Sequence, residues 1–330
     1  MKKKFLLSFI ISFLCFALMF MTVGEKFLLK NDSTALMDDG NGEETELKNN
    51  DTVKNEILFL FMGIADQNGI AKAKEKKVQG QSKYKPTGNL SDTMMLCKVN
   101  FDTGKIDILS IPRDTRVKIN GINNKTKINA AYSNGGSYLA VDTVRDLLNI
   151  DLNYYVAVDY KAVKEIVDAI GGVKIDVPRN MKYSDPTDKP PLNINIKKGL
   201  QVLDGEDAIG FLRWRKNNSM TSGYSDGDVG RIKAQQMFME ELIKQTLKPK
   251  NILKLPTLIG TYFENVETNI PMNKILQGAK MAKKIDTNNI TTEIIPGEGE
   301  YIGPTSYYIY DKTKMESLVN TMFSDYLLAE

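Results

Sequence analysis

The stretch SIPRDT at residues 110–115 follows an apolar run at 106–109 and marks the place where a strand must end. Pro112 has no N–H to donate to a sheet, so Arg113 comes directly after the carboxyl end of that strand. In open α/β sheets ligands bind at this end, and a guanidinium presents a planar fork of donors that suits phosphate oxygens. The alternative is an Arg–Asp pair that closes the strand at the protein surface.

A second strand is expected just before this one. Residues 93–101 and 105–111 flank a turn at 102–104, and this pattern predicts a β-hairpin. Asp92 begins the first strand and Arg113 follows the second. Because these ends are neighbours in an antiparallel pair, we predict that the two side chains lie close together.

Two aspartates are candidate ligands for a divalent cation. Asp92 starts a strand, and Asp66 follows the near-continuous apolar run at 56–64. Magnesium binds hard oxygen ligands, typically one or two carboxylates together with substrate phosphates. The alternative reading makes Asp92 a cap of its strand and Asp66 a turn residue.

Further side chains in the second half of the chain could bind the same anion. In an extended segment Arg213 and Arg215 point to one side and Trp214 to the other. Arg231 and Gln235 share one face of a helix that we expect over 229–247. A solvated basic surface is the alternative, but the whole set better predicts a site for two phosphates: Arg113, Lys127, Arg213, Arg215, Arg231 and Gln235.

The order of segments predicts an α/β fold. The apolar run at 56–64 suits a strand that is covered on both faces of a sheet. A strand at 154–158, a helix at 160–170 and a strand at 173–177 follow in β-α-β order, which predicts parallel pairing in part of the sheet. Residues 181–198 are expected to form a Pro-rich loop.

Composition excludes several classes of function. The 330 residues include no histidine, so His-based triads, His metal sites and the usual neutral-pH proton shuttle are ruled out. A general base would have to be a carboxylate, Lys, Tyr or Cys. The net charge of +3 is too small to indicate a nucleic-acid partner. The two cysteines, Cys15 and Cys97, lie in separate apolar runs and are not expected to form a disulfide.

The N-terminus has the pattern of a membrane anchor. Three lysines precede an uncharged run at 5–24, which as a helix is long enough to span a bilayer. The run is long and lacks a clear small-residue cleavage site, so we expect a retained anchor rather than a cleaved signal peptide. Lysines before it and acidic residues after it place residues 1–4 in the cytoplasm. Residues 25–55 read as an extracytoplasmic stalk and 56–330 as the catalytic domain, with 250–330 either completing it or extending it.

A set of short motifs appears in a fixed order along the chain. They are LSDT at 90–93, IPRDT at 111–115, KINAAY at 127–132, VDAIGGV at 167–173, LDG at 203–205, RWR at 213–215, DVGR at 228–231 and QQ at 235–236. In this order they resemble the LytR-CpsA-Psr family of bacterial envelope proteins. The resemblance runs from about residue 56 to about residue 247.

The resemblance implies a fold and an activity. Members of this family are membrane-anchored phosphotransferases with an α/β/α sandwich around a mixed sheet. They move a glycopolymer phosphate from a polyprenyl pyrophosphate carrier to a hydroxyl of peptidoglycan, with the lipid in an apolar pocket. By resemblance, Asp92 would bind Mg²⁺ or Mn²⁺. The pyrophosphate would be held by Arg113, Lys127, Arg213, Arg215, Arg231 and Gln235, with Asn129 and Tyr132 as further candidates for substrate contact. Asp92 and Arg113 are the catalytic candidates.

Two positions depart from the family pattern, and two other functions stay open. Leu90 and Ala234 stand where members often have arginine. The same pocket could hold polyprenyl phosphate for sensing, in a non-catalytic regulator of the envelope or of transcription. It could also deliver the phosphoryl group to water, in a polyprenyl pyrophosphate phosphatase. The expected partners are the lipid-linked glycopolymer, peptidoglycan and lipid of the cytoplasmic membrane.

Overall fold

The computed structural model describes residues 55–64, 84–188, 191–219, 222–225, 227–248, 251, 266–271, 273–275, 278 and 289–329. Residues Lys54–Glu330 form one compact unit. Within the described ranges, no helix combines the length and the apolar character needed to cross a bilayer. The anchor predicted at 5–24, the stalk and Asp66 lie outside these ranges.

A six-stranded mixed sheet forms the centre of the domain, with the strand order β11-β6-β1-β2-β3-β12. The β1–β2 and β2–β3 pairs are antiparallel, as the predicted hairpin requires, whereas β1–β6 and β3–β12 are parallel. Strands β1, β3, β6 and β12 therefore run the same way and end at one edge of the sheet. The strands are β1 (Glu56–Ile64), β2 (Ser91–Asn100), β3 (Ile106–Ser110), β6 (Tyr154–Asp159), β11 (Val266–Thr268) and β12 (Ile290–Ile294).

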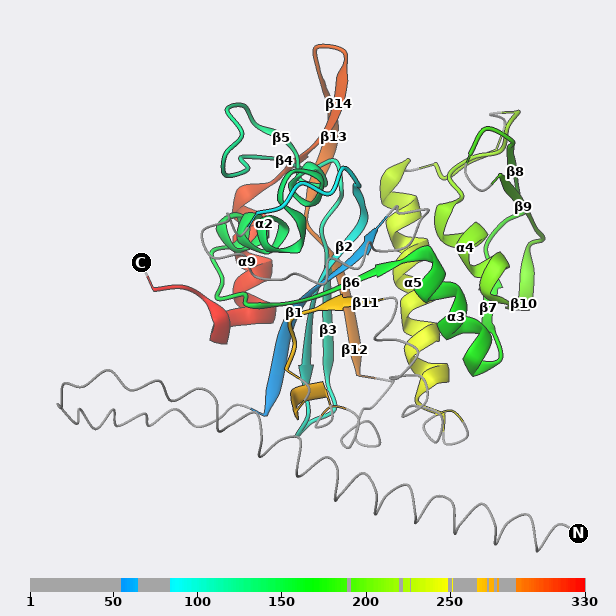
Figure 1. Ribbon diagram of the computed structural model, residues 1–330, viewed down its shortest axis with the longest axis horizontal. Coiled ribbons are helices and arrows are strands. Elements are labelled where there is room, and N and C mark those ends of the chain that lie inside the picture. Colours follow the sequence, from blue (N-terminus) through cyan, green and yellow to red (C-terminus); the bar gives the residue numbers. More distant parts are fainter. Residues whose placement is uncertain are drawn as a thin grey trace, which may run out of the picture. The chain divides into compact units, whose positions relative to one another are not determined.

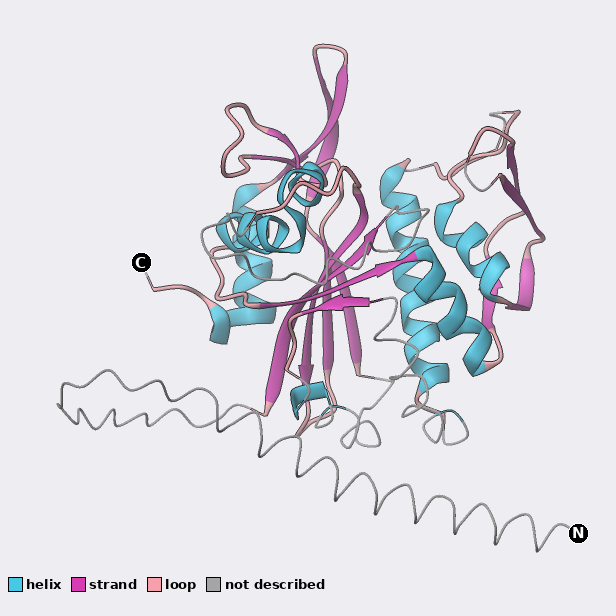
Figure 2. Ribbon diagram, viewed as in Figure 1, coloured by secondary structure: helices cyan, strands magenta, loops and turns pink. Residues whose placement is uncertain are grey.

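Helices cover both faces of this sheet (Figures 1 and 2). Alternate residues of β1 point to opposite faces, so Leu58 and Leu60 pack with α2 (Ala130–Leu148) and α9 (Lys312–Phe323). Phe59 and Phe61 pack on the other face, against Met239 of α5 and Val163 of α3. That face is covered by α3 (Tyr160–Ile170) and α5 (Asp228–Thr246). The predicted mixed, partly parallel sheet with helices is confirmed.

A second core lies beside the sheet and contains two small antiparallel pairs. Strand β7 (Val173–Val177) pairs with β10 (Gly199–Leu203), and β8 (Met181–Asp185) pairs with β9 (Leu192–Ile196). Helix α4 (Gly205–Arg213) packs between them and α3. The strand that follows α3 therefore leaves the central sheet, and the loop expected at 181–198 contains a hairpin instead. Both strand pairs alternate buried and exposed residues, as expected for strands that are covered on one face.

The last eighty residues contribute to the same domain. Strands β11 and β12 form the two edges of the central sheet, and α9 packs in the core with α2. Strands β13 (Gly297–Ile302) and β14 (Thr305–Tyr310) form a hairpin that projects beside the short pair β4 (Arg116–Val117) and β5 (Thr126–Lys127) (Figure 1). A 3₁₀ turn, η3 (Ser324–Tyr326), follows α9.

Candidate functional site

The site is built at the edge where the parallel strands end. Asp92 lies on β2, and Ile64 and Gly63 of β1 pair with Ser91 and Thr93 on either side of it, so Asp92 is the extra residue of a β-bulge. Bulges re-aim side chains and are common beside active sites. Arg113 follows β3, and its Nη1 lies 2.6 Å from Oδ1 of Asp92. The contact predicted from the hairpin alone is therefore present.

The second oxygen of Asp92 is bound by a residue that sequence reasoning missed. Tyr160 donates a hydrogen bond from its hydroxyl to Oδ2 of Asp92 at 3.0 Å. Tyr160 is the first residue of α3, and Asp159 caps this helix by accepting from the N–H of Ala162 at 2.7 Å. Because β6 lies parallel to β1, the start of α3 reaches the same edge of the sheet as Asp92.

These contacts determine the protonation of Asp92. Burial raises the pKa of Asp92, but attraction by Arg113 and Arg231 and hydrogen bonds from Arg113 and Tyr160 outweigh it. The pKa of the carboxyl is therefore below its ordinary value, and Asp92 is ionised at neutral pH. Burial and the neighbouring carboxylate raise the pKa of Tyr160, so its hydroxyl keeps the proton it donates. A carboxylate with a lowered pKa is a weak base.

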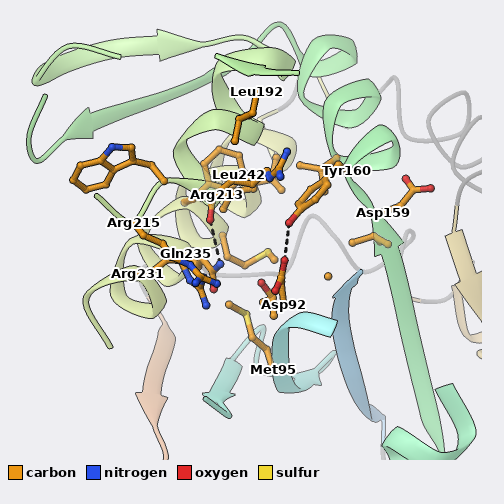
Figure 3. A pocket seen from close by; sticks show the side chains of 18 of the residues that line it. Asp92, Met95, Asp159, Tyr160, Leu192, Arg213, Arg215, Arg231, Gln235 and Leu242 are labelled. Carbon is orange, nitrogen blue, oxygen red and sulfur yellow. Dashed lines mark hydrogen bonds between the residues drawn. The ribbon is translucent and has the colours of Figure 1, made fainter. Parts of the chain in front are cut away.

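A cavity of about 550 Å³ opens next to Asp92. Arg213, Arg215, Arg231 and Gln235 all line it, and Figure 3 shows Arg215, Arg231 and Gln235 gathered near Asp92. The segment before Arg215 is not a strand, because α4 ends at Arg213 and only Trp214 is extended. Trp214 is 1% exposed and packs edge-on against Tyr224, so it holds the two arginines in place from the core side.

Arg231 is the most buried of these arginines. It lies in the first turn of α5, its side chain is 3% exposed, and its Nη2 lies 2.6 Å from Asp228 three residues earlier. Burial lowers the pKa of Arg231 to about 10, so it stays charged at neutral pH. Within the described residues, the Nε atoms of Arg231 and Arg113 have no hydrogen-bond partner. Buried donors without partners lose several kcal/mol of hydration, so these two point to an anion as the missing partner.

Arg213 is held on two sides. Its Nη2 lies 2.6 Å from Asp188 in the loop after β8, and its guanidinium lies 5.0 Å from the ring centre of Tyr160. A phosphate that binds Arg213 would therefore compete with the Asp188 carboxylate. Gln235 donates its side-chain N–H to the backbone oxygen of Leu212 at 3.3 Å, which leaves its own oxygen as an acceptor.

Apolar side chains make up much of the rest of the cavity lining. Helix α3 contributes Val163 and Ile166, and α5 contributes several more apolar side chains. A pocket with charged groups at one end and apolar walls suits an amphiphile with an anionic head. The apolar lining consists of Phe61, Met95, Val158, Val163, Ile166, Leu192, Leu212, Phe238, Met239 and Leu242.

Four of the described candidates lie outside the cavity lining, and one of them, Arg113, is paired with Asp92, which lines the cavity. Lys127 forms an ion pair with Asp114 at 2.9 Å on the β4–β5 hairpin. Tyr132 is 3% exposed in the core, and its hydroxyl bonds Glu267 at 3.3 Å. Asn129 precedes α2 and is likewise buried. Both side chains are buried because the KINAAY segment leads into the first turn of α2, and their contact with substrate stays a prediction.

The described residues fit a metal site only in part. No group of three or more Asp, Glu, Cys or His side chains comes together within the described ranges. Asp92 accepts one hydrogen bond on each oxygen and keeps lone pairs free, whereas an oxygen of Asp159 caps α3. One carboxylate with phosphate oxygens and water is a set of ligands that suits Mg²⁺. Asp92 is therefore the candidate ligand among the described residues.

The fold and this site define an α/β protein that can hold an anionic head group and an apolar tail. The family model of the LytR_cpsA_psr family matches residues 26–324, and the chain belongs to this family. TagV of Bacillus subtilis, a polyisoprenyl-teichoic acid–peptidoglycan teichoic acid transferase, is 32% identical over 287 residues, which cover 85% of this chain and 68% of TagV. TagU of Bacillus anthracis, a transferase of the same name, is 31% identical over 228 residues, 68% of this chain and 70% of TagU.

A solved structure supports the same assignment. The crystal structure of Bacillus subtilis TagV superposes with a TM-score of 0.66 at 33% sequence identity, covering 83% of this chain and 98% of the other. The shared fold is a mixed, partly parallel sheet with helices.

Proposed function

We propose that this protein is a phosphotransferase that moves a glycopolymer phosphate from a polyprenyl pyrophosphate carrier to a hydroxyl of peptidoglycan. The observation that carries the proposal is that Asp92, which is paired with Arg113, lines a largely apolar cavity together with Arg213, Arg215 and Arg231. Charged groups fit the pyrophosphate, and the apolar walls fit the polyprenyl chain. The names of TagV and TagU, which are transferases of polyisoprenyl-linked teichoic acid, support this substrate class.

The chemistry is an in-line displacement at phosphorus. The acceptor oxygen forms a bond to the phosphorus that carries the glycopolymer, and the bond from that phosphorus to the bridging oxygen breaks. Polyprenyl phosphate leaves, and the hydroxyl proton passes to it or to water. Arg213, Arg215 and Arg231 stabilise the charge of the transferring group, and such electrostatic stabilisation supplies most of the rate in phosphoryl transfer. Asp92 is a weak base and acts by holding Arg113 in place.

We also propose that the reaction depends on Mg²⁺, or on Mn²⁺ in its place. Asp92 is the described residue that would hold the ion, and the ion would offset the negative charge of the pyrophosphate. Asp66 stays a candidate second ligand from the sequence, because it comes two residues after the last residue of β1. Residues 5–24 are proposed to anchor the chain in the cytoplasmic membrane, with the catalytic domain outside.

One assay separates the three candidate functions. The full chain in detergent is incubated with a polyprenyl pyrophosphate-linked glycan, with and without Mg²⁺ and a peptidoglycan acceptor. Transfer to the acceptor supports the proposal, release of phosphorylated glycan to water alone indicates a phosphatase, and binding without release indicates a sensor. Removal of Mg²⁺ with a chelator should stop the transfer.

A variant at Arg113 tests the role of the site. Arg113→Ala removes the ion pair to Asp92 and should abolish transfer while the domain stays folded. The matched control is Arg145→Ala, which removes an arginine paired with Asp142 at 2.9 Å on α2, away from the cavity. Full activity in Arg113→Ala, with the control also active, rejects the assignment.

A further inference from the structure

A row of polar side chains extends from Asp92 away from the cavity. It consists of Asp92, Arg113, Asp114, Lys127 and Tyr307. Arg113 pairs with Asp92 at 2.6 Å, and its Nε lies 3.9 Å from Asp114. Lys127 pairs with the same Asp114 at 2.9 Å, and its ammonium lies 6.0 Å from the ring centre of Tyr307. Arg113, Lys127 and Tyr307 are all absent from the cavity lining. The row therefore connects Asp92 to the β13–β14 hairpin without passing through the apolar cavity.

Backbone contacts hold this hairpin against the site. The N–H of Tyr308 donates to the backbone oxygen of Asp114 at 2.9 Å, and Thr115 forms a parallel β-bridge with Tyr308. These contacts place the ring of Tyr307 near Arg116. The guanidinium carbon of Arg116 lies 5.7 Å from the centre of that ring. Figure 1 shows the β13–β14 and β4–β5 hairpins side by side at one end of the domain. Because paired residues share a face, Glu300 lies across the strand pair on the same face as Tyr307.

The chemistry of this row favours a polyhydroxylated partner. Carboxylates and cations alternate along it, so neither a polyanion nor a polycation is attracted along its length. It also lacks the contiguous apolar surface that a lipid chain needs. Ammonium and carboxylate groups bond hydroxyls as donors and acceptors, and a tyrosine ring offers an apolar face with a polar edge. A glycan strand matches these groups.

The direction of attack in phosphoryl transfer indicates which glycan this surface would bind. In phosphoryl transfer the attacking and leaving oxygens are roughly in line, so the acceptor enters away from the leaving group. The leaving polyprenyl phosphate belongs to the apolar cavity, and the row beyond Asp92 lies outside that cavity. On the basis of the proposed function, we propose that Tyr307, Glu300 and Lys127 form a binding surface for the glycan strand of the acceptor.

The test uses two tyrosines of one hairpin. Tyr301 pairs with Ser306 and so lies on the opposite face from Tyr307, and it is 75% exposed. Tyr307→Ala should raise the acceptor KM about tenfold, equivalent to about 1.4 kcal/mol, whereas Tyr301→Ala should leave it unchanged. The donor KM and the hydrolysis of donor without acceptor should stay the same in both variants. Tyr307→Phe, which keeps the ring, should restore most of the acceptor affinity.

A direct measurement of glycan binding tests this inference independently of the proposed function. A peptidoglycan oligosaccharide is titrated into the full chain in detergent without donor, and the same ordering of variants is expected for its dissociation constant. Absence of transfer in the wild type would reject the proposed function, while glycan binding lost only in Tyr307→Ala would still support the surface. An unchanged acceptor affinity in Tyr307→Ala, or a rise in the donor KM instead, overturns the inference. Thermal melting of Tyr307→Ala and Tyr301→Ala checks that both variants are folded.

Discussion

Replacing Tyr160 with phenylalanine removes one oxygen atom from the site and leaves the ring in place. The hydroxyl donates to Asp92 at 3.0 Å, and the ring supports the guanidinium of Arg213 at 5.0 Å. Tyr160→Phe therefore removes the hydrogen bond to Asp92 and keeps the contact between the ring and Arg213. We expect Arg213 to keep its position over the ring, while Asp92 keeps only Arg113 as a hydrogen-bond donor among these neighbours.

The expected fall in kcat follows from the strength of the hydrogen bond between Tyr160 and Asp92. A hydrogen bond to an ionised group contributes about 1.5–3 kcal/mol net, and a partner left unsatisfied in a buried site loses a similar amount. The carboxylate is 25% exposed, so water replaces part of the lost bond and the lower end of this range applies. We therefore expect kcat to fall about tenfold, since about 1.4 kcal/mol corresponds to a factor of ten.

The assay measures transfer from the lipid pyrophosphate at saturating acceptor, with kcat and donor KM determined separately. A fall in kcat with a nearly constant donor KM is expected, because the ring and the cavity are unchanged. Tyr183→Phe is the control, since Tyr183 also lines the cavity, whereas the side-chain hydrogen bonds to Asp92 from the described residues come from Arg113 and Tyr160. Equal kcat in Tyr160→Phe and the wild type, with both folded, would show that the hydroxyl does not position Asp92.

Two further predictions concern the cavity and the ion pair. Leu242→Trp fills the apolar end of the cavity, so binding of a polyprenyl pyrophosphate should weaken about tenfold or more while binding of inorganic pyrophosphate, measured by calorimetry, stays the same. The pKa of Asp92 is lowered from 3.8 by its partners, so its ion pair adds stability above that value and loses it as the pH falls through the lowered pKa. Urea unfolding of Asp92→Asn should therefore show a deficit at neutral pH that shrinks under acid conditions; a deficit that is constant with pH would contradict this.

Local patterns in the sequence were enough for part of the site. The turn at 102–104 sets the β2–β3 hairpin, and this alone brings Asp92 to Arg113, because the geometry of a hairpin depends on adjacent residues. The helix at 160–170 was also predicted at its observed bounds, since its apolar spacing and the two glycines after it are local signals. Features of this kind need no knowledge of how distant segments pair.

Contacts between distant segments could not be predicted in the same way. Tyr160 reaches Asp92 only because β6 pairs with β1, and no residue pattern in either strand specifies that partner. The sequence of β7 does indicate that this strand lies outside the centre of the sheet. Its residues VKIDV alternate apolar and charged side chains, which is typical of a strand covered on one face. In KINAAY the polar residues looked available for substrate, yet Tyr132 is buried because the segment becomes the first turn of α2.

The balance of charge around the cavity gives a physical reason for a divalent cation. Arg113, Arg213, Arg231 and Lys127 each have a carboxylate partner at 2.6 to 2.9 Å. Within the described residues Arg215 has no ion-pair partner, and burial and the nearby Arg113 lower its pKa. Among Arg113, Lys127 and the arginines that line the cavity, the described residues therefore leave about one positive charge outside an ion pair, against a pyrophosphate that carries about two or more negative charges. Binding such a group in a site of low dielectric requires added positive charge, and a divalent ion beside Asp92 would supply it without breaking the pairs that hold the arginines in position.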